Sequence, residues 1–139
     1  MTAARPRPFR WPVRVYYEDT DANGVVYYAN YLKYLERART EWIGAMAMGL
    51  RWLEGEHGAV FVVHRLEIDY LRPARLGDTL DVTVAVAEHG GSRLAVLQQV
   101  LRDGEVLADA RVALACVRRD SMRPARIPAP LIKQFEGEA

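Results

Sequence analysis

The chain has 139 residues and a formal net charge of +1, and it is 50% hydrophobic and 27% charged. These values fit one globular domain and exclude a disordered chain, and the balanced charge indicates neither nucleic acid nor a membrane surface as a partner. No apolar run reaches the roughly 18–20 residues that cross a bilayer, so we expect no membrane insertion. The single cysteine, Cys116, excludes an internal disulfide, and the N-terminus lacks the apolar stretch of a secretory signal. We therefore expect a cytoplasmic protein.

The N-terminal third of the chain predicts a tail, a strand and a long helix. Residues 1–12 hold three prolines, which lack a backbone N–H, and they predict a flexible tail. Residues 13–17 alternate and are β-branched or aromatic, which predicts a short strand. Over residues 28–49 the apolar side chains return every three or four positions, so we expect an amphipathic helix of about five turns that ends near Gly49.

The rest of the chain predicts strands. Alternating apolar residues indicate four longer strands over 59–71, 79–89, 93–102 and 105–118. Hairpin-like turns link them in a row, which predicts an antiparallel sheet. On the first of these strands, simple alternation gives one apolar face made of Val60, Val62, His64, Leu66, Ile68 and Tyr70.

This order of elements predicts an α+β fold. One curved, five-stranded antiparallel sheet would wrap the long central helix, because the apolar stripe of that helix must be buried. We expect the domain to cover residues 13–118. Residues 119–139 hold three prolines and predict a C-terminal tail, with at most a last turn around Leu131–Phe135.

The sequence DTDANG, residues 19–24, sets oxygen-bearing side chains at alternate positions in Asp19, Asp21 and Asn23. This pattern is similar to the first half of an EF-hand calcium loop, in which the twelfth residue is a bidentate Glu. The twelfth residue here is Asn30, and the segment before the motif is strand-like where an EF-hand has a helix. The pattern therefore argues against calcium, and we expect no metal.

Two other interpretations of the motif stay open on residue types alone. Asp and Asn are favoured in turns and caps, so the motif can be a polar turn without chemistry. Alternatively, the N-terminus of the predicted helix presents unpaired N–H groups that can stabilise a carbonyl oxygen as it becomes negative. A carboxylate of the motif would then attack that carbonyl or activate a water, Gly24 would permit close backbone approach, and Tyr27 and Tyr28 would supply walls.

The stretch VYYEDTDANGVVYYANYLKYLERARTEW, residues 15–42, resembles the signature of a known enzyme family. It is similar to the hotdog-fold acyl-CoA thioesterases of the 4-hydroxybenzoyl-CoA thioesterase family, and most similar to their Tol–Pal-associated branch. The family pattern is Asp-[Thr/Cys]-Asp-x-x-Gly-[Val/Ile]-Val, a Tyr or His, and then a Tyr that opens the helix. The segment LEIDYLRPARLGDTL also resembles that branch, and the resemblance covers roughly residues 13–118.

The resemblance implies hydrolysis of acyl-CoA thioesters to a free acid and coenzyme A, without a cofactor. The second Asp of the pattern, Asp21, would be the catalytic carboxylate, as nucleophile or as general base. Backbone N–H groups at the helix start, near Tyr28, would form the oxyanion hole. Family members are dimers or tetramers with active sites at the subunit interface, so we expect a homo-oligomer, either a dimer or a homotetramer.

Seven further residues are candidate substrate contacts: Gly24, Val25, Tyr27, Tyr31, Val62, His64 and Arg93. For His64 the alternative is a partnered core or interface histidine. The sequence departs from the family at Asn23, where Gly or Ala is usual, and at Tyr28, where the Tol–Pal branch often has His. Near residue 93 it holds only Arg93 where the 4-hydroxybenzoyl-CoA enzyme has a basic run for the coenzyme A phosphates.

Other functions remain as rivals. Hotdog enzymes that hydrate or dehydrate acyl thioesters typically pair a His with a carboxylate on the helix, and this chain has no His before residue 57. A non-catalytic acyl-CoA-binding protein, or a partner of a cell-envelope complex, is a rival of a different class. A hotdog enzyme that acts on acyl carrier protein thioesters is the third.

Overall fold

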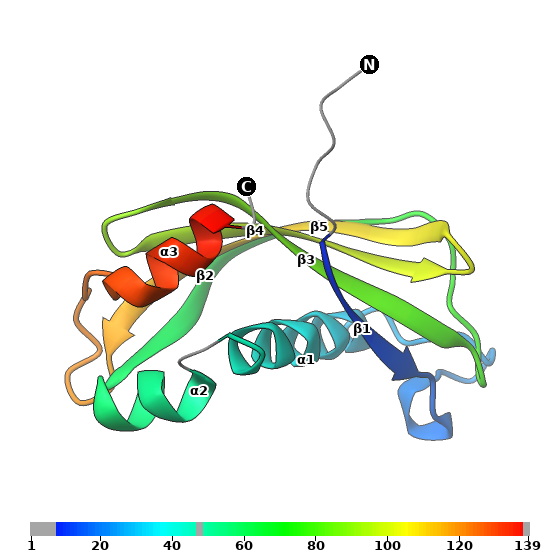
Figure 1. The fold of residues 1–139 in the computed structure, drawn as a ribbon. Coiled ribbons are helices and arrows are strands. Elements are labelled where there is room, and N and C mark those ends of the chain that lie inside the picture. The colour runs from blue at the N-terminus through cyan, green and yellow to red at the C-terminus, as the bar shows by residue number, and fades with distance from the viewer. Residues whose placement is uncertain (1–7, 47–48, 138–139) are drawn as a thin grey trace, which may run out of the picture.

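A five-stranded antiparallel sheet curves around one long helix in the computed structural model, which describes residues 8–46 and 49–137 (Figure 1). The strands are β1 Phe9–Arg14, β2 Ala59–Tyr70, β3 Thr79–Gly90, β4 Arg93–Arg102 and β5 Glu105–Arg118. The helices are α1 Asn30–Gly44, α2 Gly49–Arg51 and α3 Ala129–Gly137, with short helical turns at Tyr17–Asp19 and Trp52–Glu56. The predicted α+β fold is confirmed. Within the described ranges, none of the helices is long and apolar enough to span a bilayer.

The strand order across the sheet is β1-β3-β4-β5-β2. The turn over 72–78 was expected to join two neighbouring strands, and that expectation is wrong, because β2 pairs with β5 and not with β3. At one end of this link the Leu71 N–H donates to the carbonyl of Leu107. At the other end the carbonyl of Asp78 accepts the Val15 N–H. It therefore passes across the end of the sheet, and β2 is left as an edge strand.

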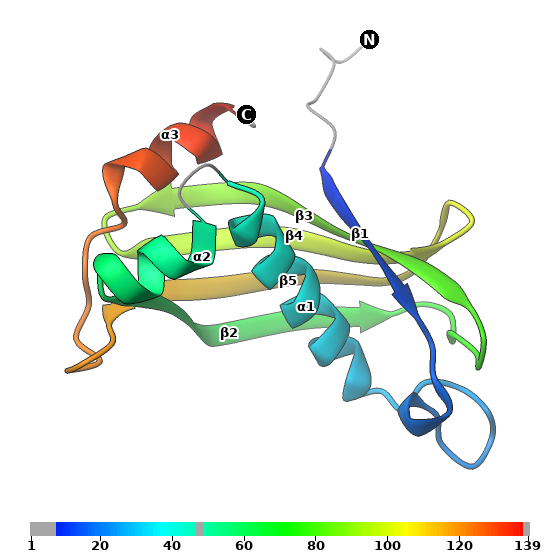
Figure 2. The ribbon, with the colours of Figure 1, turned by 60° about the horizontal axis from the view of Figure 1, so that its bottom comes forward.

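The central helix packs its apolar stripe on the concave face of the sheet (Figure 2). Its buried residues recur at the predicted spacing of three and four: Tyr31, Tyr34, Leu35, Ala38, Trp42 and Ile43. Two hydrogen bonds to Gln98 on β4 hold the middle of the helix on the sheet. Arg39 Nη1 donates to Gln98 Oε1 at 2.9 Å, and Gln98 Nε2 donates to the carbonyl of Leu35 at 3.1 Å. The bond to Leu35 is buried and the bond from Arg39 is partly buried, and satisfied polar groups in such surroundings fix one arrangement.

A β-bulge changes the face that the first half of β2 presents. The register with β5 shifts between Val63 and Arg65. Val63 is consequently the partner of the buried Leu114, and it shares a face with Leu66, Ile68 and Tyr70. The predicted face that combined Val62 and His64 with these residues is wrong, because a bulge inserts one unpaired residue and reverses the alternation.

Both termini contain structure that the sequence did not predict. Strand β1 begins at Phe9, and Pro12 is accommodated because β1 lies at a sheet edge. Residues 1–7 lie outside the described part of the chain, and so do residues 47–48, within the span expected for the helix. In the segment expected to be a tail, α3 lies beyond β3 (Figure 2), and Phe135 stacks on Trp42 with ring centroids 5.4 Å apart.

Candidate active site

The DTDANG motif folds into a tight loop between β1 and α1. Thr20 and Val26 form an isolated antiparallel bridge, and the Asp21 N–H donates to the carbonyl of Val25 at 2.8 Å. The Gly24 N–H donates back to the carbonyl of Asp21 at 3.1 Å, and Gly24 has a φ of 76°. Gly24 therefore occupies a left-handed backbone conformation, which other residues adopt only at a cost in free energy.

The link between β2 and β3 pairs with this loop through backbone hydrogen bonds. Val25 pairs with Arg75, and the Val26 N–H donates to the carbonyl of Ala74 at 2.8 Å. The Ala74 N–H donates in turn to the buried hydroxyl of Tyr31 at 2.9 Å. Tyr31, expected as a substrate contact, thus lies in the core, where it connects the loop support to α1.

Asp21 is exposed at the tip of the loop. Its Oδ1 accepts the Asn23 N–H at 2.8 Å, as expected for a polar turn. In residues 8–46 and 49–137 its other carboxylate oxygen has no hydrogen-bond partner, and no group of three or more Asp, Glu, His or Cys side chains there could hold a metal ion. One oxygen of Asp21 therefore maintains the turn while the other is available to a ligand.

Asp19 has the opposite environment, with only 6% of its surface exposed. Its Oδ2 accepts the Tyr16 N–H at 2.8 Å, and its carbonyl accepts the Tyr27 N–H at 3.0 Å and Asn30 Nδ2 at 2.9 Å. Burial, followed by the nearby Asp19 charge, raises the pKa of the Tyr34 hydroxyl well above its ordinary value. Asp19 therefore joins the end of β1, the loop and the start of α1.

The first backbone N–H groups ahead of α1 are free. The helix begins at Asn30, two residues after the expected start at Tyr28, because the preceding turn closes with a bond from the Asn30 N–H to the carbonyl of Tyr27 at 2.8 Å. In the part of the chain that the structure describes, the N–H groups of Tyr28 and Ala29 donate to no group. No side chain caps this end at Ala29, since the Asn30 side chain bonds to Asp19 instead.

Tyrosine rings line the approach to these N–H groups. Tyr28 is 63% exposed and stands 4.9 Å from Tyr27 and 6.3 Å from Tyr70, centroid to centroid. The Tyr70 hydroxyl donates to the carbonyl of Tyr28 at 3.0 Å, which fixes the backbone at the helix start. Five predicted site residues thus lie in the one segment between β1 and α1: Asp21, Gly24, Val25, Tyr27 and Tyr28.

Three predicted substrate contacts lie elsewhere in the same chain. Val62 lines a cavity of about 450 Å³ between α1 and the first half of β2, together with Arg39 and Trp42. His64 and Arg93 line a second hollow of about 500 Å³ near the hairpin between β3 and β4. His64 is exposed at the bulge and is not a core histidine.

The chain matches one protein family over most of its length. Residues 15–135 match the model of the thioesterase-like superfamily. The chain belongs to this superfamily. The resemblance of the motif to hotdog-fold thioesterases is thereby confirmed, and the matched region includes most of α3.

Individual relatives agree with the family. The chain is 44% identical over 127 residues to the acyl-CoA thioesterase YbgC of Haemophilus influenzae, covering 91% of this chain and 93% of that protein. It is 40% identical over 129 residues to the acyl-CoA thioester hydrolase YbgC of Escherichia coli O6:H1, covering 92% and 96%. A thioesterase of Thermus thermophilus, crystallised with coenzyme A and zinc, is 34% identical and superposes with a TM-score of 0.78 over 93% of this chain and 92% of that one.

Proposed function

We propose that this protein hydrolyses acyl-CoA thioesters to a free acid and coenzyme A. The observation that carries the proposal is the placement of an exposed carboxylate, Asp21, in the same loop and turn as two unpaired N–H groups, those of Tyr28 and Ala29. A thioester carbonyl needs these two elements, a nucleophile or base at its carbon and donors at its oxygen. The names of the two YbgC relatives indicate acyl-CoA as the substrate.

In the first form of the mechanism, Asp21 is the nucleophile. Its free carboxylate oxygen bonds to the carbonyl carbon, and the N–H groups of Tyr28 and Ala29 hold the oxyanion. Each such donor contributes roughly 3–4 kcal/mol to the transition state. The intermediate then collapses, the C–S bond breaks, and coenzyme A leaves as a thiolate that takes a proton from water. A water hydrolyses the resulting mixed anhydride, which releases the acid and restores Asp21.

In the second form, Asp21 is a general base. It takes a proton from a water that attacks the same carbonyl carbon, so that the acid forms in one addition and the C–S bond breaks on collapse. The protonated carboxyl then returns its proton to the leaving thiolate. Both forms use the same oxygen of Asp21 and the same N–H groups, and neither needs a cofactor.

We also propose a homo-oligomer in which β2 edges of two copies pair antiparallel. An edge strand offers unpaired backbone groups, and on β2 these flank Val63 and Tyr70, which are 47% and 44% exposed. Antiparallel pairing would bring the end of β2 near Tyr28 to the start of β2 in the other copy, where Val62 lines the cavity beside α1. That cavity would then receive the acyl group. We propose the cytoplasm as the compartment, in keeping with the one free thiol, that of buried Cys116.

Thiol release from a panel of acyl-CoA substrates tests the activity. Acetyl-, butyryl-, hexanoyl-, palmitoyl-, benzoyl- and 4-hydroxybenzoyl-CoA would be offered to the wild-type protein at matched concentrations. We expect turnover of at least one, and the best substrate would define the acyl preference. Turnover of none of them would contradict acyl-CoA hydrolysis, and a parallel assay with acyl carrier protein thioesters would test the nearest alternative.

A further inference from the structure

The cavity between α1 and the start of β2 has an apolar bottom and a polar mouth. Its most deeply buried lining residues are each no more than 4% exposed: Trp42, Leu53, Leu94 and Leu114. Its polar lining residues are half-buried or exposed: Glu36, Arg39, Thr40 and Glu54. A ligand that enters past the polar residues can therefore bury an apolar end among the others.

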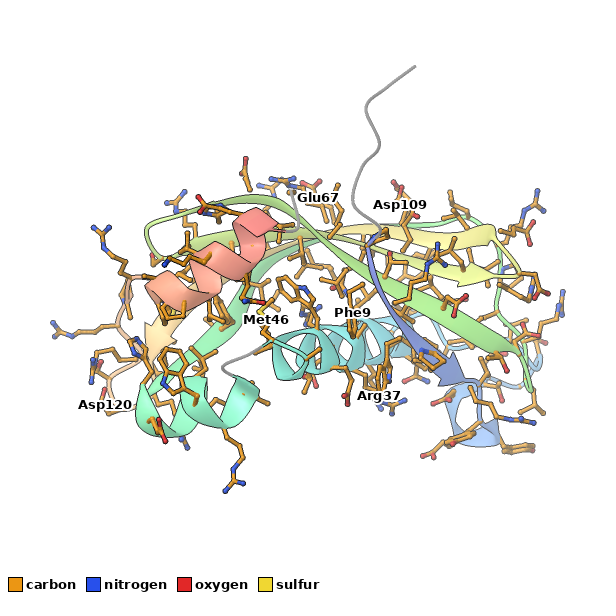
Figure 3. All side chains as sticks on the ribbon, in the orientation of Figure 1. Phe9, Arg37, Met46, Glu67, Asp109 and Asp120 are labelled. Atoms are coloured by element: carbon orange, nitrogen blue, oxygen red, sulfur yellow. The ribbon has the colours of Figure 1, made fainter. Side chains whose placement is uncertain are left out.

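Trp42 separates this cavity from the C-terminal helix. Its ring stacks on Phe135 of α3, with centroids 5.4 Å apart and planes inclined by 16°, while Trp42 also lines the cavity. Phe135 is 1% exposed and lies behind that ring, since the described residues that line the cavity do not include it. Figure 3 shows Met46 at the C-terminal end of α1, on the side where α3 lies. Two stacked rings thus close this end of the cavity.

The position of α3 keeps these rings in place. Leu131 of α3 is fully buried, and the Phe135 ring also contacts His89 on β3, with centroids 6.0 Å apart. Just before the helix, the Ile127 N–H donates to the carbonyl of Gly91, between β3 and β4, at 2.9 Å. Close-packed side chains resist displacement, so the Trp42 ring cannot retreat from a long ligand while Phe135 stands behind it.

The cavity is short in comparison with a long acyl chain. Its lining residues on α1 run from Glu36 to Ile43, which is about 10 Å at roughly 1.5 Å per residue. Its volume of about 450 Å³ lies in the lower part of the range of small-ligand sites, about 300–1,000 Å³. An extended palmitoyl chain is longer than this cavity and would meet Trp42 before it was fully buried.

We propose that Trp42, supported by Phe135 of α3, ends the acyl cavity and sets the longest acyl group that the protein accepts. The inference rests on the proposed acyl-CoA hydrolysis and on the placement of the acyl group in this cavity. Each methylene buried in an apolar cavity strengthens binding about fourfold, so kcat/KM should rise with chain length until the chain meets Trp42. The substrates are uncharged acyl groups of short to medium length, because an ionised end would be buried among apolar side chains.

Chain-length profiles test this role of Trp42. We would measure kcat/KM for butyryl-, hexanoyl-, decanoyl- and palmitoyl-CoA with the wild type, Trp42→Leu and Phe135→Leu. In Trp42→Leu, which shortens the wall itself, we expect the palmitoyl-to-hexanoyl ratio to rise at least about tenfold, as for two more buried methylenes. Phe135→Leu changes no lining residue and lets Trp42 move back, so the ratio should rise about threefold. A ratio within one variant does not depend on the fraction of active protein.

Leu107→Ala is the matched control. Leu107 is fully buried on β5, and the described residues that line the cavity do not include it. The substitution should destabilise the protein and leave the ratio at its wild-type value. A wild type that hydrolyses palmitoyl-CoA as efficiently as hexanoyl-CoA, or an unchanged ratio in Trp42→Leu, would overturn the proposal. Should Trp42→Leu fail to fold, an unchanged ratio in Phe135→Leu would overturn it.

Binding of non-hydrolysable S-alkyl-coenzyme A thioethers of the same chain lengths separates this proposal from the activity. Calorimetric titration would give the dissociation constant of each thioether for the wild type and Trp42→Leu. A length limit that shifts to longer chains in Trp42→Leu, without hydrolysis of any acyl-CoA, would support this proposal and contradict the proposed function. Hydrolysis of acyl-CoA with the same length preference in both proteins would leave the proposed function and overturn the role of Trp42.

Discussion

The two aspartates of the DTD motif are two residues apart and have opposite environments. Asp19 is buried, and its side chain and backbone bond to Tyr16, Tyr27 and Asn30. Asp21 is exposed, and its side chain makes one hydrogen bond within its own turn. The difference indicates a division within one motif: the first carboxylate fixes the frame of the loop, and we propose that the second, which is exposed, acts on the substrate. Substitutions at and around the two positions can test this division.

The largest expected effect on stability is that of Asp19→Ala. The substitution removes a buried carboxylate and leaves the partly buried Tyr16 N–H without its acceptor, so we expect the free energy of unfolding to fall by about 2–3 kcal/mol. Urea denaturation at pH 7 would measure it. The matched variant Asp21→Ala should change stability by less than about 1 kcal/mol, because its site is exposed. Equal losses in the two variants would show that the environments do not differ as described.

A smaller loss is expected from Gly24→Ala. A Cβ at Gly24 would meet no atom within 4 Å, so the cost comes only from the φ of 76°, about 1–2 kcal/mol in the free energy of unfolding. Gly44→Ala at the end of α1 serves as the control, because it also meets no atom and has no positive φ. A loss at Gly24 no greater than that at Gly44 would mean that the loop does not need its left-handed residue.

The smallest expected effect is a pH dependence of stability that comes from Asp78, in the link between β2 and β3. Burial acts to raise the pKa of Asp78, but hydrogen bonds from the Arg75 N–H and the Arg102 guanidinium outweigh it, and the pKa lies below its ordinary value of 3.8. A depressed folded-state pKa gives stability that is present above 3.8 and lost as the pH falls through the lower folded value.

Denaturation at pH 7, 5 and 3 would detect this contribution, which we expect to be about 1 kcal/mol or less because the pair is partly exposed. Asp78→Asn should show a weaker decline of stability between pH 5 and pH 3 than the wild type. A variant whose decline matches that of the wild type would exclude Asp78 as its source.

The sequence predicted the elements that depend on local period and turn chemistry. The strands over residues 59–118 begin and end within one residue of their predicted limits, because short turns with glycine separate runs of period two. It did not predict that β2 lies beside β5, since the link over 72–78 has the composition of a hairpin turn although it crosses the sheet end. It also missed the bulge at Val63–Arg65, which has no glycine to mark it.

The candidate site was predicted in part. The motif identified Asp21 and the N–H groups near Tyr28, but spacing alone could not separate a buried Asp19 from an exposed Asp21. One signal was available: Asp19 stands three residues after Tyr16, where an acidic residue reaches back to a backbone N–H in a capping box. Helix α3 was missed because prolines precede it, although its leucine and phenylalanine four residues apart both reach the core.

The most direct test of the account is the turnover of Asp21→Asn with the best acyl-CoA substrate. The variant keeps the side-chain oxygen that accepts the Asn23 N–H and removes only the charge, so stability should be unchanged. We expect kcat to fall at least about 100-fold with KM changed only a few-fold, as for a group that acts in the transition state. A folded Asp21→Asn protein with a near-normal kcat would contradict the assignment of the chemistry to Asp21.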